Sequence, residues 1–411
     1  MRNRVSGLAL LTLLLGTLSS AAHAQQSQED RIKALEERII SLEGQVRMLQ
    51  AQQQPAASAP ATPEVAAVPA ARAAEQAGSL PVYGGASAAS KALNPDISVI
   101  GDFLGSMGHN PMVPTPAFQM HESEVGLQAI IDPYARGDFF ISFGEQGVNL
   151  EEGYITFTAL PAGFVLRGGK MRATFGKVNT LHNHVLPWTD RPLVTNSLVG
   201  GEDGINDAGL SLTRILPAPK GLFLEATGQV FRGDSGDVFA SSKRSDVSAV
   251  AHLRGYRDLT ESTNLDIGAS YARGHNDLGS RYLTQLYGVD ATVRWKPLRR
   301  SIYHSFVGRS EFIWSQREQL PHLQRSFGFY TSGDYQLGRR WFAGARYDRS
   351  DRSRDAALTD SGASLVLTYW PSEFSQLRGQ YRLTRYAEHF DAHEFLMQLQ
   401  FSLGAHGAHP F

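Results

Sequence analysis

Two histidines separated by one residue, His182 and His184, are the side chains whose types and spacing most directly suggest metal chemistry. They stand in the segment HNH, and the carboxylates of Glu202 and Asp203 follow further along the same stretch. Imidazole nitrogens combined with carboxylate oxygens suit zinc and related divalent metals. The alternative is ordinary polar usage in a loop. The sequence therefore raises a zinc site at His182 and His184 as a hypothesis, and it indicates no other cofactor.

Charged residues in the body of the chain form a second group of candidates. The acidic members fall in its first half, at Glu124, Asp138, Glu152 and Glu225. The basic members fall in its second half, at Arg254, Arg294, Arg309, Arg346, Arg378 and Arg382. If the body closes into a ring, opposite charges face each other across a lumen and create a transverse field that orients dipolar solutes. The alternative is that these charges pair locally and only hydrate the wall.

Composition and motifs exclude several kinds of chemistry. The 411 residues contain no cysteine, which removes disulfides, thiol catalysis and zinc–thiolate sites. A formal net charge of −1 gives no general attraction for nucleic acid. The chain has neither a G-x-S-x-G nucleophile elbow nor an H-E-x-x-H metalloprotease motif. We therefore expect a protein that is not an enzyme.

Short runs with a period of two are the elements that must position these side chains. The run EFLMQLQFSL, residues 394–403, sets its apolar residues on one side and Gln398, Gln400 and Ser402 on the other, together with Leu396. The apolar set is Phe395, Met397, Leu399, Phe401 and Leu403. This period is typical of a strand and not of a helix. Similar runs separated by alternately short and long connections predict about sixteen strands between residues 95 and 404.

The composition of the two faces indicates which solvent each face meets. The polar faces carry Gly, Ser, Gln, Asp and Arg but little Lys, unlike the wetted face of a soluble sandwich. Aromatic residues gather at strand ends, with Trp295, Trp341 and Trp370 beside short turns and Trp314 near a long loop. Such girdles are typical of barrels in membranes. We expect an all-β transmembrane antiparallel barrel over residues 95–404, with apolar residues against outer-membrane lipid and a tail at 405–411.

The region before the body predicts targeting and self-association. Residues 1–24 have the charged start, short apolar core and Ala-His-Ala site of a signal peptide. Residues 25–52 hold heptads with Ile32, Ile39 and Val46 at position a and Leu35, Leu42 and Leu49 at position d. This repeat predicts a short α-helical coiled coil, placed in the periplasm, through which subunits associate. Residues 53–94 are rich in Ala, Pro and Gln and predict a disordered linker.

One long connection carries a resemblance to a known family. The stretch from Phe164 to Leu212 contains Gly169-Lys170, Phe175-Gly176, Asp190-Arg191-Pro192-Leu193 and Gly200-Gly201. In these motifs it resembles the phosphate-selective porin O and P superfamily, and LEEGYITF before it resembles that family's preceding strand. The lysine-rich ladder of true phosphate channels is not visible, so phosphate selectivity is not carried over.

The resemblance implies a bacterial outer-membrane porin that forms a homotrimer. It also implies that the third external loop, residues 172–206, folds inward and constricts a passage for small hydrophilic solutes or ions. Phe411 ends the chain as in barrels whose last strand is read by the barrel-assembly machinery. The alternative function is a surface protein of the outer membrane, linked to zinc through its loops or tethered to the cell wall through its coil.

Overall fold

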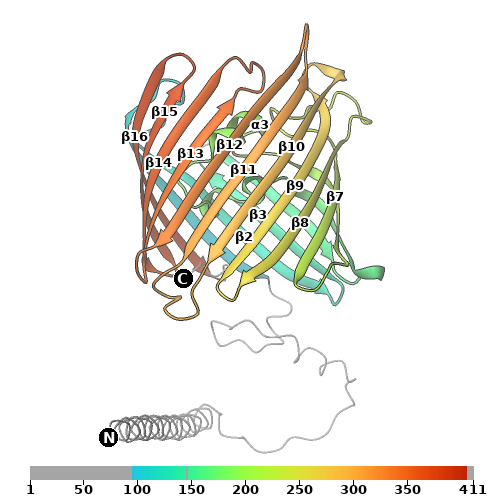
Figure 1. Ribbon diagram of the computed structural model, residues 1–411. Coiled ribbons are helices and arrows are strands. Elements are labelled where there is room, and N and C mark those ends of the chain that lie inside the picture. The colour runs from blue at the N-terminus through green and yellow to red at the C-terminus, as the bar shows by residue number, and fades with distance from the viewer. Residues whose placement is uncertain (1–94, 145–146, 405–411) are drawn as a thin grey trace, which may run out of the picture. The chain divides into compact units, whose positions relative to one another are not determined.

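Sixteen strands form one closed antiparallel barrel, in which each strand pairs with its neighbours in sequence and β1 pairs with β16 (Figure 1). The computed structural model describes residues 95–144 and 147–404. The predicted signal peptide, the coiled coil of Ile32 to Leu49, the linker and the tail lie outside the described residues. The predicted fold class of the body, an antiparallel barrel of about sixteen strands, is confirmed.

The strands have the following bounds. They are β1 Asp96–His109, β2 Phe118–Asp132, β3 Ala135–Gly144, β4 Gly147–Phe157, β5 Phe164–Arg172, β6 Asn206–Leu216, β7 Leu222–Phe231, β8 Ser248–Thr260, β9 Thr263–Asn276, β10 Gly279–Trp295, β11 Phe306–Glu318, β12 Leu323–Gln336, β13 Trp341–Asp351, β14 Thr359–Ser372, β15 Ser375–Tyr386 and β16 Phe390–Gly404. The predicted run at residues 394–403 lies within β16.

Alternation of side chains along β16 separates an apolar outer face from a polar inner face. Phe395, Met397, Leu399, Phe401 and Leu403 are exposed on the outside of the barrel. Gln398, Gln400, Ser402 and Leu396, by contrast, are buried on the inside. The other strands show the same arrangement, with exposed Leu, Val, Ile and Phe on the outside. An outer band of this composition suits contact with hydrocarbon.

The connections differ in part from the expected alternation. The end of the barrel where β1 begins and β16 ends carries mainly short turns, but the β10–β11 connection spans residues 296–305. At the opposite end, the connections are residues 110–117, 145–146, 173–205, 232–247, 277–278, 319–322, 352–358 and 387–389. Several of these are as short as the turns, because their strands extend further than the alternation of the sequence indicated.

The tryptophans follow the expected girdles with one exception. Trp295 and Trp341 lie at the turn ends of β10 and β13, and Trp314 is exposed on the outer face of β11. The expectation for Trp370 was wrong, because this residue follows the buried Thr368 by two and therefore points inward, with 8% of its surface exposed.

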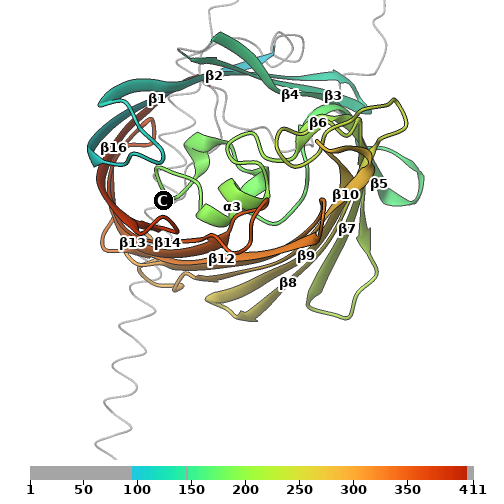
Figure 2. The same ribbon diagram turned by 90° about the horizontal axis from the view of Figure 1, so that it is seen from above.

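The connection between β5 and β6, residues 173–205, folds into the barrel and is called the inserted loop below. It contains the 3₁₀ turns η2 (Val178–Thr180) and η3 (Asn183–Val185) and the helix α3 (Leu193–Leu198), which lie inside the ring of strands (Figure 2). A further 3₁₀ turn, η1 (Pro161–Gly163), joins β4 to β5. Among the described residues, no helix is long and apolar enough to cross a membrane.

The apolar core of this protein lies between the inserted loop and one side of the wall. Loop residues Phe175, Trp188 and Val194 are almost fully buried in one cluster with inward-facing Ile313 and Tyr330. Helix α3 contacts β11, β12, β13 and β14. Because burial of apolar surface stabilises this packing, the loop is a fixed part of the barrel.

Candidate functional site

The inserted loop enters the lumen through a turn that requires glycine. Gly176 has φ +60°, and a Cβ at this position would collide with the carboxylate of Glu311 on β11. Its backbone N–H donates to Ser270 Oγ at 2.9 Å. Glycine is the residue for which this backbone conformation carries no steric cost. The Phe-Gly pair in the sequence therefore serves to seat the loop against the wall.

Arg191 holds the inserted loop in its own shape. The guanidinium donates to Val178 O at 3.0 Å, to Leu181 O at 2.6 Å and to Asn183 Oδ1 at 3.1 Å. Only 5% of the Arg191 surface is exposed. Burial, together with the nearby charge of Arg172, lowers the pKa of Arg191 to about 10. The side chain thus ties the η2 turn, through Val178 O, to the Leu181 carbonyl and the Asn183 side chain.

Two irregularities in strand pairing add side chains to the wall opposite this loop. The pairing of β1 with β2 skips His121, and the pairing of β3 with β4 skips Glu151. Such β-bulges bend a strand and re-aim its side chains. As a result, both Glu151 and its neighbour Glu152 are buried on the inside. The wall here presents a carboxylate cluster, defined as Glu122, Glu124, Glu151 and Glu152.

His182 of the inserted loop projects into the carboxylate cluster. Its Nδ1 lies 2.6 Å from Glu124 Oε2 and 3.2 Å from Glu151 Oε2, and its Nε2 lies 2.8 Å from Glu152 Oε2. Burial alone would lower the pKa of His182, but its hydrogen bonds to the three carboxylates raise this pKa to about 11. The imidazolium therefore fastens the loop to β2 and β4.

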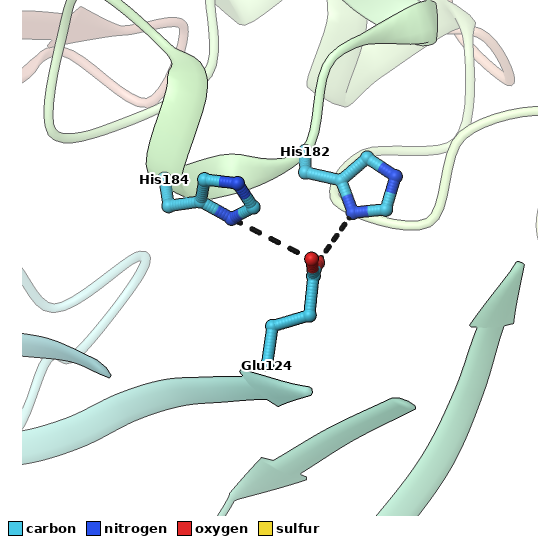
Figure 3. A group of neighbouring side chains, drawn as sticks. All are labelled: Glu124, His182 and His184. Carbon is cyan, nitrogen blue, oxygen red and sulfur yellow. Dashed lines mark hydrogen bonds and ion pairs between the residues drawn. The ribbon is translucent and has the colours of Figure 1, made fainter. Parts of the chain in front are cut away.

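His184 lies beside His182 and points toward the same carboxylate, that of Glu124 (Figure 3). Its Nδ1 is 3.8 Å from Glu124 Oε2. Burial lowers the pKa of His184 despite the nearby charge of Glu124. The structure thus brings together the two histidines proposed as metal ligands.

The carboxylates expected beside these histidines were the wrong ones. Glu202 lies 3.4 Å from His121 Nε2 and also accepts from the Asn183 amide, while Asp203 offers its backbone oxygen to Arg172. The loop turns its histidines into the barrel and not outward, so they meet the wall rather than the end of their own loop.

On the other side of the inserted loop, the loop carries the negative charge and the wall carries the positive charges. Asp190 Oδ2 accepts hydrogen bonds of 2.9 Å from both Arg346 and Arg382. Burial would raise the pKa of Asp190, but the two guanidinium charges lower it to about 2. Arg346 also lies 4.7 Å from the ring centre of Trp188. The loop is thus bound to β13 and β15 by the ion pairs of Asp190 and, on β13, also by the cation–π contact between Arg346 and Trp188.

The ten charged residues proposed to line the lumen all lie on the inward face of their strands. They are Glu124, Asp138, Glu152, Glu225, Arg254, Arg294, Arg309, Arg346, Arg378 and Arg382. The structure brings Glu124 and Glu152 together at His182, and Arg346 and Arg382 together at Asp190. Their part in selecting solutes stays a prediction.

Several of the arginines pair with carboxylates on the wall itself. Arg254 forms an ion pair of 2.8 Å with Asp266, and Arg309 pairs with Asp334. Arg294 lies 3.8 Å from the same Asp266. Arg378 instead donates to the carbonyl of Trp188 at 3.1 Å and to Gln398 at 2.7 Å. On this half of the wall, local pairing describes the geometry better than a row of free charges.

Two cavities flank the inserted loop. One of about 420 Å³ is lined by α3 together with Thr284, Arg317 and Arg352. The other, of about 230 Å³, lies against β1, β2 and β15 and is lined by His121 and Arg382 among others. Both linings combine polar and charged side chains with apolar ones, so charged groups of the wall border open space beside the loop.

Comparison with known proteins places the fold. No protein-family model matches this sequence. An uncharacterized protein of Aquifex aeolicus is 27% identical over 386 aligned residues, covering 78% of this chain and 81% of the relative.

Solved structures with a similar fold include the anion-selective porin from Comamonas acidovorans, at 10% identity and a TM-score of 0.55 over 75% of this chain and 99% of that one. The outer membrane channel DcaP of Acinetobacter baumannii has 12% identity and a TM-score of 0.51, over 75% and 96% of the two chains. OprB of Pseudomonas putida has 10% identity and a TM-score of 0.51, over 77% and 95%. The chain therefore has the fold of outer-membrane porins, and its place in the phosphate-selective superfamily stays a prediction.

Proposed function

We propose that this protein is a porin-like channel of the outer membrane, through which small hydrophilic solutes or ions diffuse passively. The observation that carries the proposal is a closed sixteen-stranded wall with an apolar outer face and charged side chains on its inner face. An inner face of this kind keeps water in a lumen, while the outer face matches hydrocarbon. The porin fold of the solved structures with which it aligns supports the same function.

In this proposal the inserted loop is the constriction. Fastening at His182 on one side and at Asp190 on the other keeps it across the lumen. Solutes then pass beside the loop, along surfaces that include Arg382 and Arg317. We therefore expect a narrow channel whose selectivity depends on loop and wall together, with no catalytic residue. A homotrimer, held in part by the periplasmic coil, is included in the proposal.

Recording of single channels in planar bilayers tests the proposal. Purified protein, shown to be folded by the shift of its electrophoretic mobility on heating, should produce stable ohmic steps. The reversal potential measured in a gradient of potassium chloride should then show whether the channel prefers cations or anions. Folded protein that inserts into the bilayer without conducting would contradict the channel function. Removal of the inserted loop provides the matched variant and is considered in the Discussion.

A further inference from the structure

We propose that Glu124, His182 and His184 form a binding site for a divalent cation of the zinc class where the inserted loop meets β2 and β4. This inference goes beyond the channel function and does not depend on it. It assigns a ligand to a cluster that is more elaborate than fastening a loop requires.

The geometry of the three side chains suits such an ion. One ligand atom from each lies within 4.8 Å of the others. The distances from Glu124 Oε2 are 2.6 Å to His182 Nδ1 and 3.8 Å to His184 Nδ1 (Figure 3). Tetrahedral zinc with bonds of about 2.0–2.2 Å separates its ligands by roughly 3.4 Å. A small rotation of the imidazoles therefore admits the ion.

An unpartnered nitrogen provides an independent reason to place a ligand here. Within the described part of the chain, His184 Nδ1 is buried and has no hydrogen-bond partner. The His184 side chain is only 9% exposed and points at the Glu124 carboxylate. Burying a polar atom in this way costs free energy unless something satisfies it. A cation between His184 and Glu124 would accept the lone pair of His184 Nδ1 and remove the free-energy cost of burying that nitrogen without a partner.

The surroundings supply the outer groups that metal sites require. Glu152 Oε2 lies 2.8 Å from His182 Nε2, where it can orient the ring while Nδ1 faces the ion. Glu152 is itself held by the backbone N–H of Arg172 at 2.7 Å. Glu151 Oε2, 3.2 Å from His182 Nδ1, is placed to become a fourth ligand.

Charge at the site also favours a dication. The carboxylate cluster contributes four acidic groups, of which Glu122 Oε1 is buried without a hydrogen-bond partner among the described residues. The fixed positive charges nearby belong to Arg172, which pairs with Glu151 at 3.2 Å, and to Arg191. The third positive charge is the imidazolium of His182 in the metal-free protein, and a zinc ion would displace its Nδ1 proton and take over its charge. A divalent ion would complete the compensation of the buried negative charge.

The ligand types select the class of ion. Two imidazole nitrogens favour zinc, cobalt or nickel over calcium and magnesium, which take oxygen ligands. The 230 Å³ cavity comes near the site, since its lining includes Asn183, which stands between the two histidines. Because the ligands come from both loop and wall, a bound ion would fasten the loop more firmly.

Isothermal titration calorimetry with Zn²⁺ tests the site. The sample is the folded, untagged, full-length mature chain in detergent, from which EDTA has first removed any bound metal. We expect one saturable zinc site per chain and no comparable binding of Mg²⁺. Substitution of Co²⁺ should give visible absorption of a low-symmetry nitrogen–oxygen site. His184→Ala should weaken zinc binding at least tenfold, and Glu124→Gln provides a second variant if the first fails to fold. His252→Ala is the control, since the one described residue to which this buried histidine on β8 hydrogen-bonds is Ser270, at 2.8 Å from Oγ.

Two results would overturn the site. One is wild-type protein that binds zinc no better than magnesium. The other is a folded His184→Ala or Glu124→Gln variant that retains wild-type affinity. Neither result touches the channel function, because the titration requires no conductance.

Discussion

The carboxylate of Asp190 on the inserted loop accepts a hydrogen bond of 2.9 Å from Arg382 on β15. On the far side of the same loop, His182 binds the carboxylates of β2 and β4. The acidic first half of the wall therefore holds a loop cation, and the arginine-rich second half holds a loop anion. This complementarity gives the uneven charge distribution of the sequence a structural role in addition to any action on solutes.

Asp190→Asn should release the arginine side of the loop. Arg346 and Arg382 would each lose a hydrogen bond to a partly buried carboxylate while keeping Asp348 and Glu394 as partners, which costs about 1.5 to 3 kcal/mol of loop-fastening free energy. We expect larger and noisier single-channel conductance, measured in planar bilayers at neutral pH. Asp234→Asn, which changes an exposed carboxylate in the loop that joins β7 to β8 and lies outside this network, is the control. Conductance equal to that of wild type would refute the fastening role.

The depressed pKa of Asp190 sets an acid limit for the same contact. Its pKa of about 2 lies below the usual value near 3.8, so its contribution to stability is present above pH 3.8 and is lost as pH falls toward 2. The buried Trp188 lies against Arg346, which binds Asp190, so its fluorescence should change in this acid range. In Asp190→Asn that part of the change should disappear.

His182 should give the opposite pH dependence. Its pKa is raised to about 11 from the usual value near 6.5, so its stabilisation is complete below pH 6.5 and is lost as pH rises toward 11. With EDTA present, we expect quencher access to Trp188 to increase at alkaline pH. His182→Gln should show high access already at neutral pH, because leaving the carboxylates unpaired costs about 3 to 5 kcal/mol. An identical alkaline profile in wild type and variant would contradict this assignment.

The alternation of apolar and polar residues was sufficient to predict the strands and the inward position of the ten charged residues, because a period of two leaves only two faces. It could not predict Glu151, since a β-bulge changes the phase of the alternation at that residue. The consecutive pair Glu151-Glu152, polar at both positions, was the available signal. Arg346 and Asp348, two residues apart on one strand, form a pair that the same periodicity could have identified.

The docking of the inserted loop was beyond local patterns. Asp190 meets Arg382 across a long sequence separation, and only the closed barrel brings them together. The glutamates that bind His182 lie earlier in the chain, on β2 and β4. Glu202 and Asp203, which are closer to the histidines in sequence, were therefore the wrong choice of partners. No pattern in the sequence indicated that Trp188 and Phe175 are buried inside the barrel, because an apolar core within the lumen departs from the usual polar interior of a barrel.

Gly176→Ala should disturb the seating of the inserted loop without removing any charge. The added Cβ meets the Glu311 carboxylate, and the residue keeps φ +60°, which favours glycine. We expect a loss of about 1 to 3 kcal/mol in stability toward urea and a wider spread of conductance. Gly228→Ala is the matched control, because nothing lies within 4 Å of its added Cβ. Equal effects of the two substitutions would show that the turn at Gly176 does not seat the loop.

Replacing residues 173–205 by a short Gly-Ser connection should widen the channel. Arg172 and Asn206 are paired in register, so a tight connection can join β5 to β6 without altering the wall. We expect a severalfold rise in single-channel conductance and weaker ion selectivity. The same connection in place of residues 296–305, which join β10 to β11 at the other end of the barrel, is the control.

Because the replacement of the inserted loop uncovers apolar wall residues, the double variant His182→Gln/Asp190→Asn provides a second test that keeps the loop. Conductance unchanged in both folded proteins would remove the loop from its role as the constriction.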